Sequence, residues 1–392
     1  MSEKKLRILV VTNNYPSQQH PHVGTFVAAL VEEWVRIGSS VTVLAPRALR
    51  SAQALRQWWS PTLPSPSQPL VAQPPFLSFS ARRLTPFGGS TRSWTQTSFE
   101  RAALRATRKM KQEFDVIYGH FLYPGGAAAA RIGRELGLPA VVALGESSME
   151  HWIREFGWAR ARRDLDNLNA IVSVSLENAD WIKEKFDIPS EKITVVPNAV
   201  DTNRFTPMDR SDARKQLGLP SDRLIGVFVG HFIDRKGPLR ALDAINRNPN
   251  VSGVFLGSGP QVPTGDAVLH AGHVPHAEIP IWLSAGDFFI FPTLAEGSPN
   301  AAIEAMACGL PVVSSNIPSL RETVSEAEGR LVDPESADAL ASAVRELAES
   351  PDLRAQLAKG ALERARRFTL PKRARLIHGT LEALTRDTPT ST

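Results

Sequence analysis

Short apolar runs alternate with longer amphipathic stretches along the first half of the chain, and this alternation predicts parallel strands joined by helices. The apolar runs predict strands at 7–11, 41–45, 116–119, 140–144 and 171–174. Helical periodicity lies between them, at 26–37, 98–112, 126–137 and 176–186. A domain with this order is doubly wound, with helices covering both faces of a parallel sheet.

A second set of alternating segments begins after Phe205. Strands are predicted at 224–230, 251–256, 268–271, 288–291 and 312–314. Helices are predicted at 238–247, 299–308 and 371–385, and from Ala337 and Leu353 onward. Because the segment 198–205 separates the two sets, we predict a first domain over 1–200, a second over 201–370, and a C-terminal helix and tail over 371–392.

Composition is ordinary for a soluble globular protein, and the 392 residues fit two domains. No run approaches the roughly 20 apolar residues that span a bilayer. The start, MSEKKLRILVV, reads as a first strand rather than a signal peptide. We therefore expect a cytoplasmic protein. The single cysteine, Cys308, excludes an internal disulfide, and its place in an apolar helix favours a packing role.

Basic residues outnumber acidic ones over the first 115 positions, although the whole chain has a net charge of only +5. Segment 47–59 mixes arginine with leucine and tryptophan, so we expect a helix there that either lies on an anionic membrane face or is an ordinary solvated surface helix. Nucleic acid is a weaker interpretation, because no nucleic-acid-binding motif accompanies the charge. The proline-rich segment 60–76 predicts an extended loop with little regular structure.

The segment 289–315 combines an apolar strand, a loop, an apolar helix and another strand. Ser298 is a suitable N-cap and Pro299 a suitable first helical residue, and Gly309 is placed to end the helix. Asn300 and Glu304 are four residues apart and share one helix face. This arrangement opens a helix N-terminus at the carboxyl edge of a parallel sheet, where ligands bind.

Two glutamates give this segment its candidate chemistry. Glu296 lies in the loop and Glu304 on the helix, which is otherwise mostly apolar. A buried carboxylate is unfavourable without a partner, and a sugar or ribose diol would supply one. The alternative is a packed helix with one solvated glutamate and an ordinary loop glutamate.

The residues 296–313, EGSPNAAIEAMACGLPVV, resemble the donor-site motif of the GT-B retaining glycosyltransferases of family 4. Four further stretches resemble other motifs of this family and follow the order that those motifs have in the family. They lie at 6–16 with 24–26, 114–120, 193–201 with Phe205, and 230–237. The resemblance implies an α/β fold of GT-B type, with two doubly wound Rossmann-like domains facing across a cleft. It also implies that the first domain faces the acceptor, that the second binds the nucleotide-sugar donor, and that the last helix returns to the first domain.

The same resemblance assigns roles around the donor phosphates and sugar. Lys236 would hold the diphosphate and stabilise the departing nucleotide, with Arg235 assisting. Glu296 would bind sugar hydroxyls and help to place the charge that develops at the anomeric carbon. Gly24 would let the backbone approach the phosphate, and His120 would contact the sugar from the first domain.

Other positions match contacts to the nucleoside and the sugar. Glu304 would bind the ribose hydroxyls, and Val274 would line the nucleobase. Backbone donors would come from the segment of Ser298, Pro299 and Asn300, although proline itself has none.

Two places depart from the family's pattern. His231 stands where an arginine is usual, so either His231 donates a weaker hydrogen bond to the diphosphate or Arg235 supplies the charge. Segment 145–148, Gly-Glu-Ser-Ser, replaces a common His-Gly-x-Asp that faces the acceptor. Glu146 is the candidate substitute for the missing polar groups.

The implied reaction is transfer of a sugar from a nucleotide sugar, with UDP favoured, to a saccharide or lipid-linked acceptor in polysaccharide or glycoconjugate biosynthesis. Family members are thought to use a front-face route without an enzyme nucleophile. We expect no cofactor and no metal, because the pair Asp164 and Asp166 precedes its strand instead of following one. The alternatives are a nucleotide-sugar epimerase or a phosphorylase on the same fold, or a non-catalytic nucleotide-sugar-binding protein. An NAD-dependent oxidoreductase is disfavoured because no G-x-G-x-x-G follows the first strand.

Overall fold

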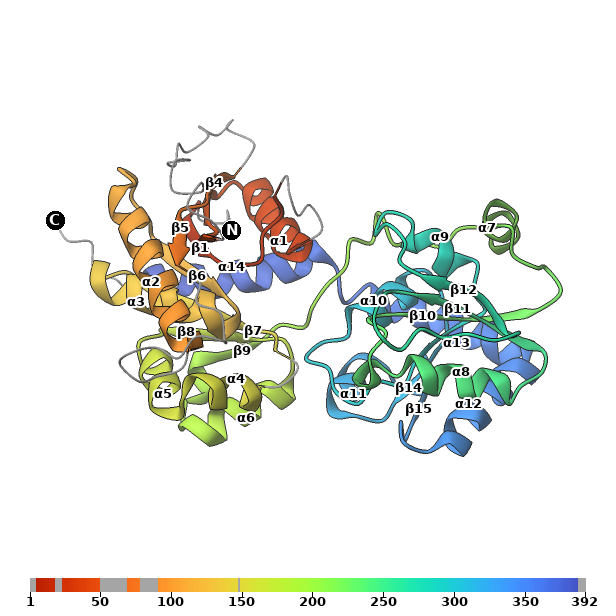
Figure 1. Cartoon of the computed structure of the whole chain (residues 1–392). Helices are drawn as coiled ribbons and strands as arrows, with labels where there is room; N and C mark the ends of the chain where they lie inside the picture. The colour runs from red at the N-terminus through yellow and green to blue at the C-terminus, as the bar shows by residue number, and fades with distance from the viewer. Residues whose placement is uncertain (1–4, 18–22, 50–68, 78–90, 147–148, 387–392) are drawn as a thin grey trace. The chain divides into compact units, whose positions relative to one another are not determined.

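The computed structural model describes residues 5–17, 23–49, 69–77, 91–146 and 149–386 (Figure 1). The chain forms two compact units, one made of 1–196 with 373–392 and the other of 197–372. The chain therefore passes between the units at Val196–Pro197 and Lys372–Arg373, where the sequence led us to expect divisions after 200 and 370. Within the described ranges, no helix is long and apolar enough to cross a membrane.

The first unit is built on a seven-stranded parallel sheet with the strand order β4-β2-β1-β6-β7-β8-β9. The strands are β1 (Arg7–Val11), β2 (Ser40–Leu44), β4 (Leu70–Ala72), β6 (Val116–His120), β7 (Ala140–Leu144), β8 (Ala170–Ser173) and β9 (Ile193–Val195). Most of their residues are buried, as expected when helices cover both faces of a parallel sheet.

Helices cover the two faces of this sheet in separate layers (Figure 1). Side chains alternate between the faces, so Ile8 and Val10 pack with α1 and α14, while Leu9 and Val11 pack with α2, α3 and α5. The helices are α1 (Thr25–Ile37), α2 (Thr91–Lys109), α3 (Ala127–Leu136), α4 (Met149–Phe156), α5 (Trp158–Asp166), α6 (Leu176–Phe186) and α14 (Leu370–Arg386). The predicted doubly wound α/β arrangement is confirmed.

The C-terminal helix α14 is an integral part of this unit. Ala374, Ile377 and Leu381 lie in the same apolar cluster as β1 and α1. The indole Nε1 of Trp34 donates to the carbonyl of Ala374 at 3.0 Å. Arg373, which is buried, donates to the carbonyl of Val196 at 2.5 Å. This last bond joins the two points at which the chain leaves and re-enters the unit.

Several predictions for the first unit are wrong. Residues 47–49, predicted to begin a helix, form strand β3 (Arg47–Leu49), which pairs in parallel with β5 (Pro75–Leu77). The rest of that predicted helix, 50–59, lies outside the described residues, as does 60–68 of the predicted extended loop. The end of that loop contains strands β4 and β5 instead of irregular chain. The helices α4 and α5 and the strand β9 were not predicted at all.

The second unit holds a six-stranded parallel sheet with the order β12-β11-β10-β13-β14-β15. Its strands are β10 (Leu224–Val229), β11 (Val251–Leu256), β12 (Val268–Gly272), β13 (Phe288–Phe291), β14 (Val312–Ser315) and β15 (Gly329–Val332). Its helices are α7 (Arg210–Leu217), α8 (Pro238–Asn246), α9 (Ile279–Ser284), α10 (Asn300–Ala307), α11 (Pro318–Thr323), α12 (Ala337–Glu349) and α13 (Pro351–Ala365). The strand β15 and the helices α7, α9 and α11 were not predicted.

Each sheet reverses its strand order at one point. In the first sheet the reversal lies between β1 and β6, and in the second between β10 and β13. At such a point the connections leave toward opposite faces, which opens a crevice beyond the carboxyl ends of the strands. Gly24 follows β1 and His120 ends β6, while Lys236 and Glu296 follow β10 and β13, so each pair stands at the reversal of its own sheet.

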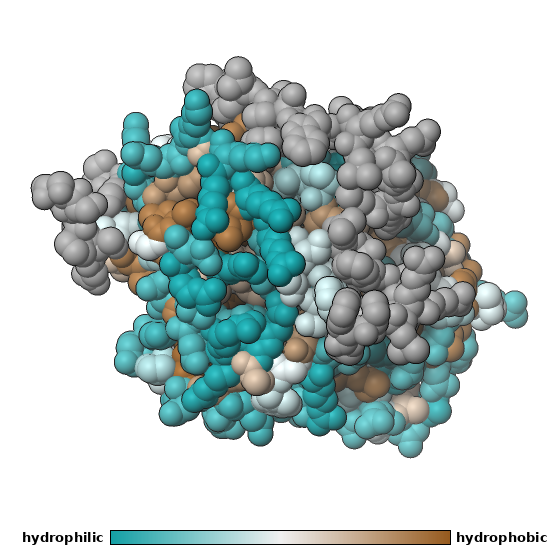
Figure 2. All heavy atoms as spheres, turned by 60° about the vertical axis from the view of Figure 1, so that its left-hand side comes forward, coloured by the Kyte–Doolittle hydropathy of each residue, from teal (hydrophilic) through white to brown (hydrophobic). Residues whose placement is uncertain are grey.

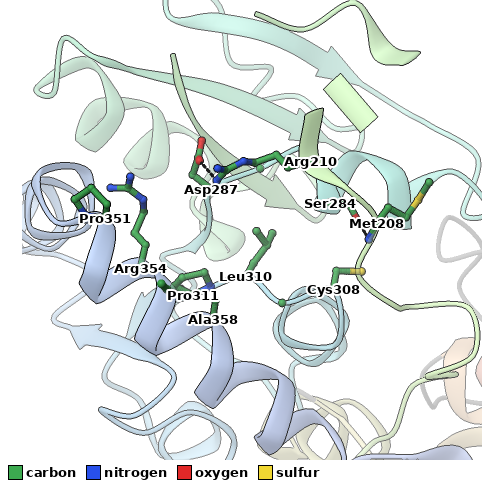
Figure 3. Close-up of a pocket in the computed structure, with 13 residues that line it drawn as sticks. Met208, Arg210, Ser284, Asp287, Cys308, Leu310, Pro311, Pro351, Arg354 and Ala358 are labelled. Carbon is green, nitrogen blue, oxygen red and sulfur yellow. Dashed lines mark hydrogen bonds and ion pairs between the residues drawn. The ribbon is translucent and has the colours of Figure 1, made fainter. Parts of the chain in front are cut away.

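The opposite edge of the second sheet is held by a buried ion pair. Asp287, immediately before β13, accepts from Arg214 Nη2 at 2.6 Å and from the backbone N–H of Ile225 at 2.7 Å. Arg210 also donates to it at 2.5 Å, beside a pocket of about 350 Å³ (Figure 3). The side chains of Asp287 and Arg214 are only 2% and 7% exposed. Asp287 therefore joins α7 to the starts of β10 and β13.

Replacing Asp287 tests this structural role. We expect Asp287→Ala to destabilise the protein by about 3–5 kcal/mol, because it leaves the buried Arg214 guanidinium without its counter-charge. Urea-induced unfolding measures the effect. Asp338→Ala is the control, because that aspartate is 96% exposed in its pair with Arg247 and should unfold at nearly the wild-type urea concentration. Equal effects of the two substitutions would contradict the assignment.

Candidate functional site

Two loops at the reversal of the second sheet are held together by hydrogen bonds. The loop after β10 ends in a short helical turn, Asp234–Lys236, and the loop after β13 begins at Pro292. Leu294 N–H donates to the carbonyl of Arg235 at 2.8 Å, and Thr293 Oγ1 lies 3.0 Å from the same oxygen. Gly237 follows with φ 77°, and a Cβ there would lie 2.2 Å from the carbonyl oxygen of Pro292. Only glycine allows this approach between the two loops.

Lys236 and Glu296 form the charged centre of these loops. Lys236 Nζ lies 2.5 Å from Glu296 Oε1, and their side chains are 16% and 9% exposed. Thr293 Oγ1 donates to the same carboxylate oxygen at 2.8 Å, and Arg235 Nη1 lies 3.6 Å from it. Burial lowers the pKa of Lys236, although the Glu296 carboxylate opposes this shift. The cluster therefore concentrates two cationic groups around one carboxylate beside the carboxyl ends of β10 and β13.

The helix α10 carries the second predicted glutamate. Glu304 is buried, and its Oε1 lies 3.4 Å from Nε2 of His276, whose side chain is 41% exposed. His276 also contacts Phe205 edge-on, with ring centroids 5.7 Å apart. Asn300 begins the helix on the same face, and its buried Oδ1 has no hydrogen-bond partner among the described residues. This face therefore offers acceptor groups that the protein itself satisfies only in part.

The start of α10 differs from the predicted cap. The N-cap is Pro299 and the first helical residue is Asn300, so Ser298 does not cap the helix. Instead, Ser298 Oγ accepts from the backbone N–H of Asn198 at 3.1 Å. The N–H of Asn300 donates to the carbonyl of Ser298 at 3.1 Å, so this expected ligand donor is used within the turn. The predicted end is confirmed, because Gly309 has a φ of 81° directly after the C-cap Cys308.

The remaining predicted residues of this unit lie around the same edge of the sheet. The side chain of His231 is exposed in the loop after β10. Val274 follows β12 and packs partly against the core of the unit. Arg235 donates through Nη1 to the carbonyl of Ala295 at 2.6 Å, which orients its guanidinium toward the loop that carries Glu296.

Gly24 and His120 belong to the first unit. Gly24 has φ 70° directly before α1, and a Cβ there would lie 2.2 Å from the carbonyl oxygen of Asn14. His120 ends β6, is 6% exposed, and packs against Phe26 and Phe121 with ring centroids 5.2 and 4.6 Å away. Its Nδ1 is buried with no hydrogen-bond partner in the described part of the chain.

His120 is held in its neutral form. Burial, together with the positive charge of the buried Arg373, lowers its pKa to about 3. The next residue, Phe121, has φ 60°, a conformation that is unfavourable for an aromatic side chain. His120 is therefore a neutral donor or acceptor at the entrance to a constrained turn, Phe121–Gly126.

Glu146, which follows the neighbouring strand β7, stabilises the start of this turn through hydrogen bonds. Its carboxylate accepts from the backbone N–H groups of Leu122 at 2.7 Å and Gly145 at 2.9 Å. Its own carbonyl accepts from Asn178 Nδ2 at 3.0 Å. The departure at 145–148 therefore places a buried carboxylate beneath the turn that follows His120. Ser147 and Ser148, the rest of that segment, lie outside the described residues.

The structure thus brings Arg235, Lys236 and Glu296 into contact in the second unit, with Glu304 on the neighbouring helix. Three contributors were not predicted from the sequence: Thr293, His276 and Asn198. Thr293 and His276 follow predicted strands closely, which was the available signal, while nothing in the sequence connects Asn198 with Ser298. The described residues contain no group of three or more His, Cys, Asp or Glu side chains arranged to hold a metal ion.

Comparisons with known proteins cover both units. Residues 23–204 match the family described as Glycosyltransferase Family 4, and residues 209–364 match Glycosyl transferases group 1. The chain is 27% identical over 396 residues to the Bacillus subtilis (strain 168) protein named as teichuronic acid biosynthesis glycosyltransferase TuaC, covering 97% of this chain and 99% of that one. It is 30% identical to D-inositol 3-phosphate glycosyltransferase of Actinosynnema mirum, over 69% of this chain and 73% of the relative.

Solved structures share the fold at lower identity. Sucrose-phosphate synthase from Thermosynechococcus elongatus superposes with a TM-score of 0.77 at 21% identity, over 98% of this chain and all of that one. Anabaena Alr3699/HepE, solved in complex with UDP and glucose, superposes with a TM-score of 0.72 at 19% identity, over 96% of this chain and all of that one. Both similarities extend over nearly the whole chain and establish its fold.

The buried Glu146 predicts a specific pH dependence of stability. Burial raises its pKa from 4.5 to about 6 against the opposing effect of its hydrogen bonds, so the folded state binds the proton more tightly than the unfolded state. This contribution to stability is complete below pH 4.5 and is lost as the pH rises through 6. Glu146→Gln, which cannot ionise, should therefore gain on the order of 2 kcal/mol relative to wild type between pH 4.5 and 7.

Urea unfolding at several pH values measures this difference. Glu150→Gln is the control, because Glu150 is exposed on α4 in a surface pair with Arg154, so the substitution should change the free energy of unfolding by less than about 1 kcal/mol at every pH tested. A Glu146→Gln difference that is also constant with pH would contradict the assigned protonation.

Proposed function

Because the chain belongs to the GT-B-fold glycosyltransferases of family 4 (glycosyl transferases group 1), we propose that it is a retaining glycosyltransferase. The proposed reaction moves a sugar from a nucleotide-diphosphate sugar to an acceptor hydroxyl. The observation that carries the proposal is the cluster of Lys236, Arg235 and Glu296 at the strand reversal of the second sheet. A diphosphate requires cationic groups at such a crevice, and a sugar requires carboxylate acceptors beside them.

Lys236 and Arg235 are the proposed ligands of the diphosphate. In the structure Lys236 is paired with Glu296 through Oε1, whereas Oε2 of Glu296 has no hydrogen bond to any described residue. A bound diphosphate would share Lys236 with that carboxylate, and the free oxygen would accept from a sugar hydroxyl. As the glycosidic bond breaks, negative charge grows on the diphosphate, and a cation already in place stabilises it without reorganisation.

Glu304 is the proposed ligand of the ribose. Among the described residues, the only polar side chain in contact with this carboxylate is His276, whose Nε2 lies 3.4 Å from Oε1, so a ribose diol could occupy the remaining acceptor positions. Val274, between β12 and His276, would contact the base. We favour UDP as the nucleotide, and the complexes of the structurally similar Anabaena protein with UDP and glucose support that choice.

We propose that the first unit helps to position the sugar and supplies no charged catalytic group. His120 stays neutral, so it contributes a hydrogen bond to the sugar and no positive charge. In the proposed front-face route, the departing diphosphate takes the proton of the acceptor hydroxyl. The new bond to the anomeric carbon therefore forms on the face from which the nucleotide leaves, and the configuration is retained.

The acceptor is proposed to be a saccharide or lipid-linked saccharide in polysaccharide or glycoconjugate biosynthesis. The relative named for teichuronic acid biosynthesis, which aligns over nearly its whole length, supports this class. The similarity to glycosyltransferases does not favour the alternatives of an epimerase or a non-catalytic nucleotide-sugar-binding protein.

We also propose that the protein is cytoplasmic and that its first unit contacts an anionic membrane surface. The helix α2 carries Arg92, Arg101, Arg105 and Arg108. Trp94, Trp152 and Trp158 are 37–42% exposed on α2, α4 and α5, and Arg92 lies 5.9 Å from the ring centroid of Trp152. Arginine and tryptophan together favour the interface between water and anionic lipid.

Donor binding and turnover test the assigned residues separately. UDP-glucose should raise the melting temperature of the wild-type protein in a saturable manner, and Glu304→Ala should abolish this shift because it removes the ribose ligand. Lys236→Ala should lower UDP release by about 100-fold or more, because it removes the cation that stabilises the leaving group. Glu349→Ala, an exposed glutamate of the same unit, is the matched control. A full shift in Glu304→Ala would show that this residue does not hold the nucleotide.

Chelation tests the proposal that no metal is required. Lys236 and Arg235 supply positive charge at the proposed diphosphate site, so we expect UDP release to be unchanged after treatment with EDTA. Activity that is lost with EDTA and restored by a divalent cation would refute this part of the proposal.

A further inference from the structure

A pocket of about 280 Å³ lies in the first unit between α2, α3 and α5, on the helical layer and away from the strand reversal. Its charged lining comes from all three helices: Glu100, Arg131, Arg134, Arg160, Arg163 and Asp164. Four guanidinium groups thus face two carboxylates, which leaves an excess of positive charge. None of these residues has a role in the sugar transfer proposed above.

The two carboxylates lie at the base of the pocket. Glu100 and Asp164 have side chains only 7% and 10% exposed. Glu100 forms a short ion pair with Arg160 and a 3.4 Å contact with Arg131. Asp164 accepts from Arg163 Nη2 at 3.1 Å. The Glu100 pairs hold the inner guanidinium groups in place, while Asp164 orients the outer Arg163 through its Nε and Nη2 and leaves its Nη1 for another acceptor.

The arginines have more donors than these carboxylates can satisfy. Four guanidinium groups carry about twenty N–H donors, whereas two carboxylates offer about eight acceptor positions. The buried Nε atoms of Arg131 and Arg160 have no hydrogen-bond partner within the described ranges, although Arg160 Nε lies 3.5 Å from Asp164. An additional anion would meet this excess.

The outer two arginines are available to a ligand. Arg134 and Arg163 have side chains 52% and 57% exposed. Within the part of the chain that the structure describes, the one ion-pair contact of Arg134 is at 4.0 Å, with the neighbouring Glu135. Burial, followed by the charge of Glu100, raises the pKa of Asp164 against the opposing charges of Arg160 and Arg163, and both carboxylates lie at the floor of the pocket. The rim is therefore more cationic than the floor.

We propose that this pocket binds a phosphate group, presented either by a soluble phosphate compound or by a lipid headgroup. Arginine suits phosphate because its planar donors match two phosphate oxygens at once. The pocket volume exceeds the space of a single water, about 30 Å³, by enough to admit a tetrahedral anion and the first atoms of an attached group. The proposal does not depend on the donor chemistry of the second unit.

The surface around the pocket fits a charged ligand. Figure 2 turns the side of the molecule that carries α2 and α3 forward, and shows long hydrophilic side chains gathered there beside smaller apolar patches. The exposed Trp94 and Trp158 lie on α2 and α5, two of the helices that form the pocket. A phosphate bound here would thus lie on the face that we propose to contact anionic lipid.

The test compares rim substitutions with a charge-matched control. Arg134→Gln with Arg163→Gln removes two exposed pocket arginines, while Arg345→Gln with Arg367→Gln removes two exposed arginines of the second unit, outside both the pocket and the surface proposed to contact lipid. All proteins carry Lys236→Ala, so that phosphate held by the proposed donor site does not contribute. Inorganic phosphate is titrated calorimetrically at constant ionic strength.

We expect saturable phosphate binding in the Lys236→Ala protein and in the control pair, with affinities within two-fold of each other. The pocket pair should bind phosphate at least ten-fold more weakly. Absence of saturable binding, or equal losses in both pairs, would overturn the proposal. UDP-glucose binding to the protein with Lys236 intact is measured separately, so failure of this proposal is distinguishable from failure of the proposed transferase activity.

Vesicles distinguish the two sources of phosphate. Flotation is measured with vesicles of phosphatidylcholine alone and with vesicles that also contain phosphatidic acid. A loss of binding to phosphatidic acid in the pocket pair that exceeds the loss in the control pair supports a lipid headgroup. Equal vesicle binding by the two pairs, together with the ten-fold difference for inorganic phosphate, supports a soluble phosphate compound.

Discussion

The reversal of strand order in each parallel sheet is the constraint on which both candidate ligand surfaces depend. Between β10 and β13 the connecting chains leave in opposite directions, so two loops meet at one edge with no strand between them. Those loops carry Lys236 and Glu296, whose charged atoms lie 2.5 Å apart. The same geometry beside β1 and β6 places Gly24 and His120 at the edge of the first sheet. Residues distant in the sequence therefore become neighbours through strand order alone.

The charges at these edges are controlled by burial and by their partners. Burial lowers the pKa of Lys236, but the charge of Glu296 and its hydrogen bond with Lys236 offset part of this effect. Burial, aided by the nearby charge of Arg373, lowers the pKa of His120 to about 3, so its imidazole is neutral. One sheet edge thus presents cations suited to a diphosphate, whereas the other presents a neutral imidazole. Residue type and local environment together set this difference, because burial lowers the pKa of both Lys236 and His120 from different starting values.

The sequence was most informative where hydrophobic periodicity was strong. The strand β7 and the helix α6 have the predicted boundaries, because apolar runs and amphipathic repeats respond directly to burial. The segment 47–49 was assigned the wrong structure because its pairing partner, β5, lies in a proline-rich stretch that gives no local strand signal. The helices α4 and α5 were missed because they are short and rich in charged residues, and their packing against α2 and α3 is tertiary. At α10 the predicted N-cap was wrong, because Ser298, although a favourable capping residue, instead accepts a hydrogen bond from the backbone N–H of Asn198.

The sequence by itself determined the alternating α/β order, the family to which the chain is similar, and the residue types available at the strand ends. These properties are local, since they depend on periodicity, turn residues and short motifs. Only the tertiary structure decided that Thr293 and Arg235 surround Glu296, that His276 faces Glu304, and that Glu146 supports the turn after His120. It also decided that arginines from separate helices line one pocket with two carboxylates. These contacts depend on strand order and helix packing. They join groups that are far apart in the sequence, and no local sequence pattern predicts which of them will meet.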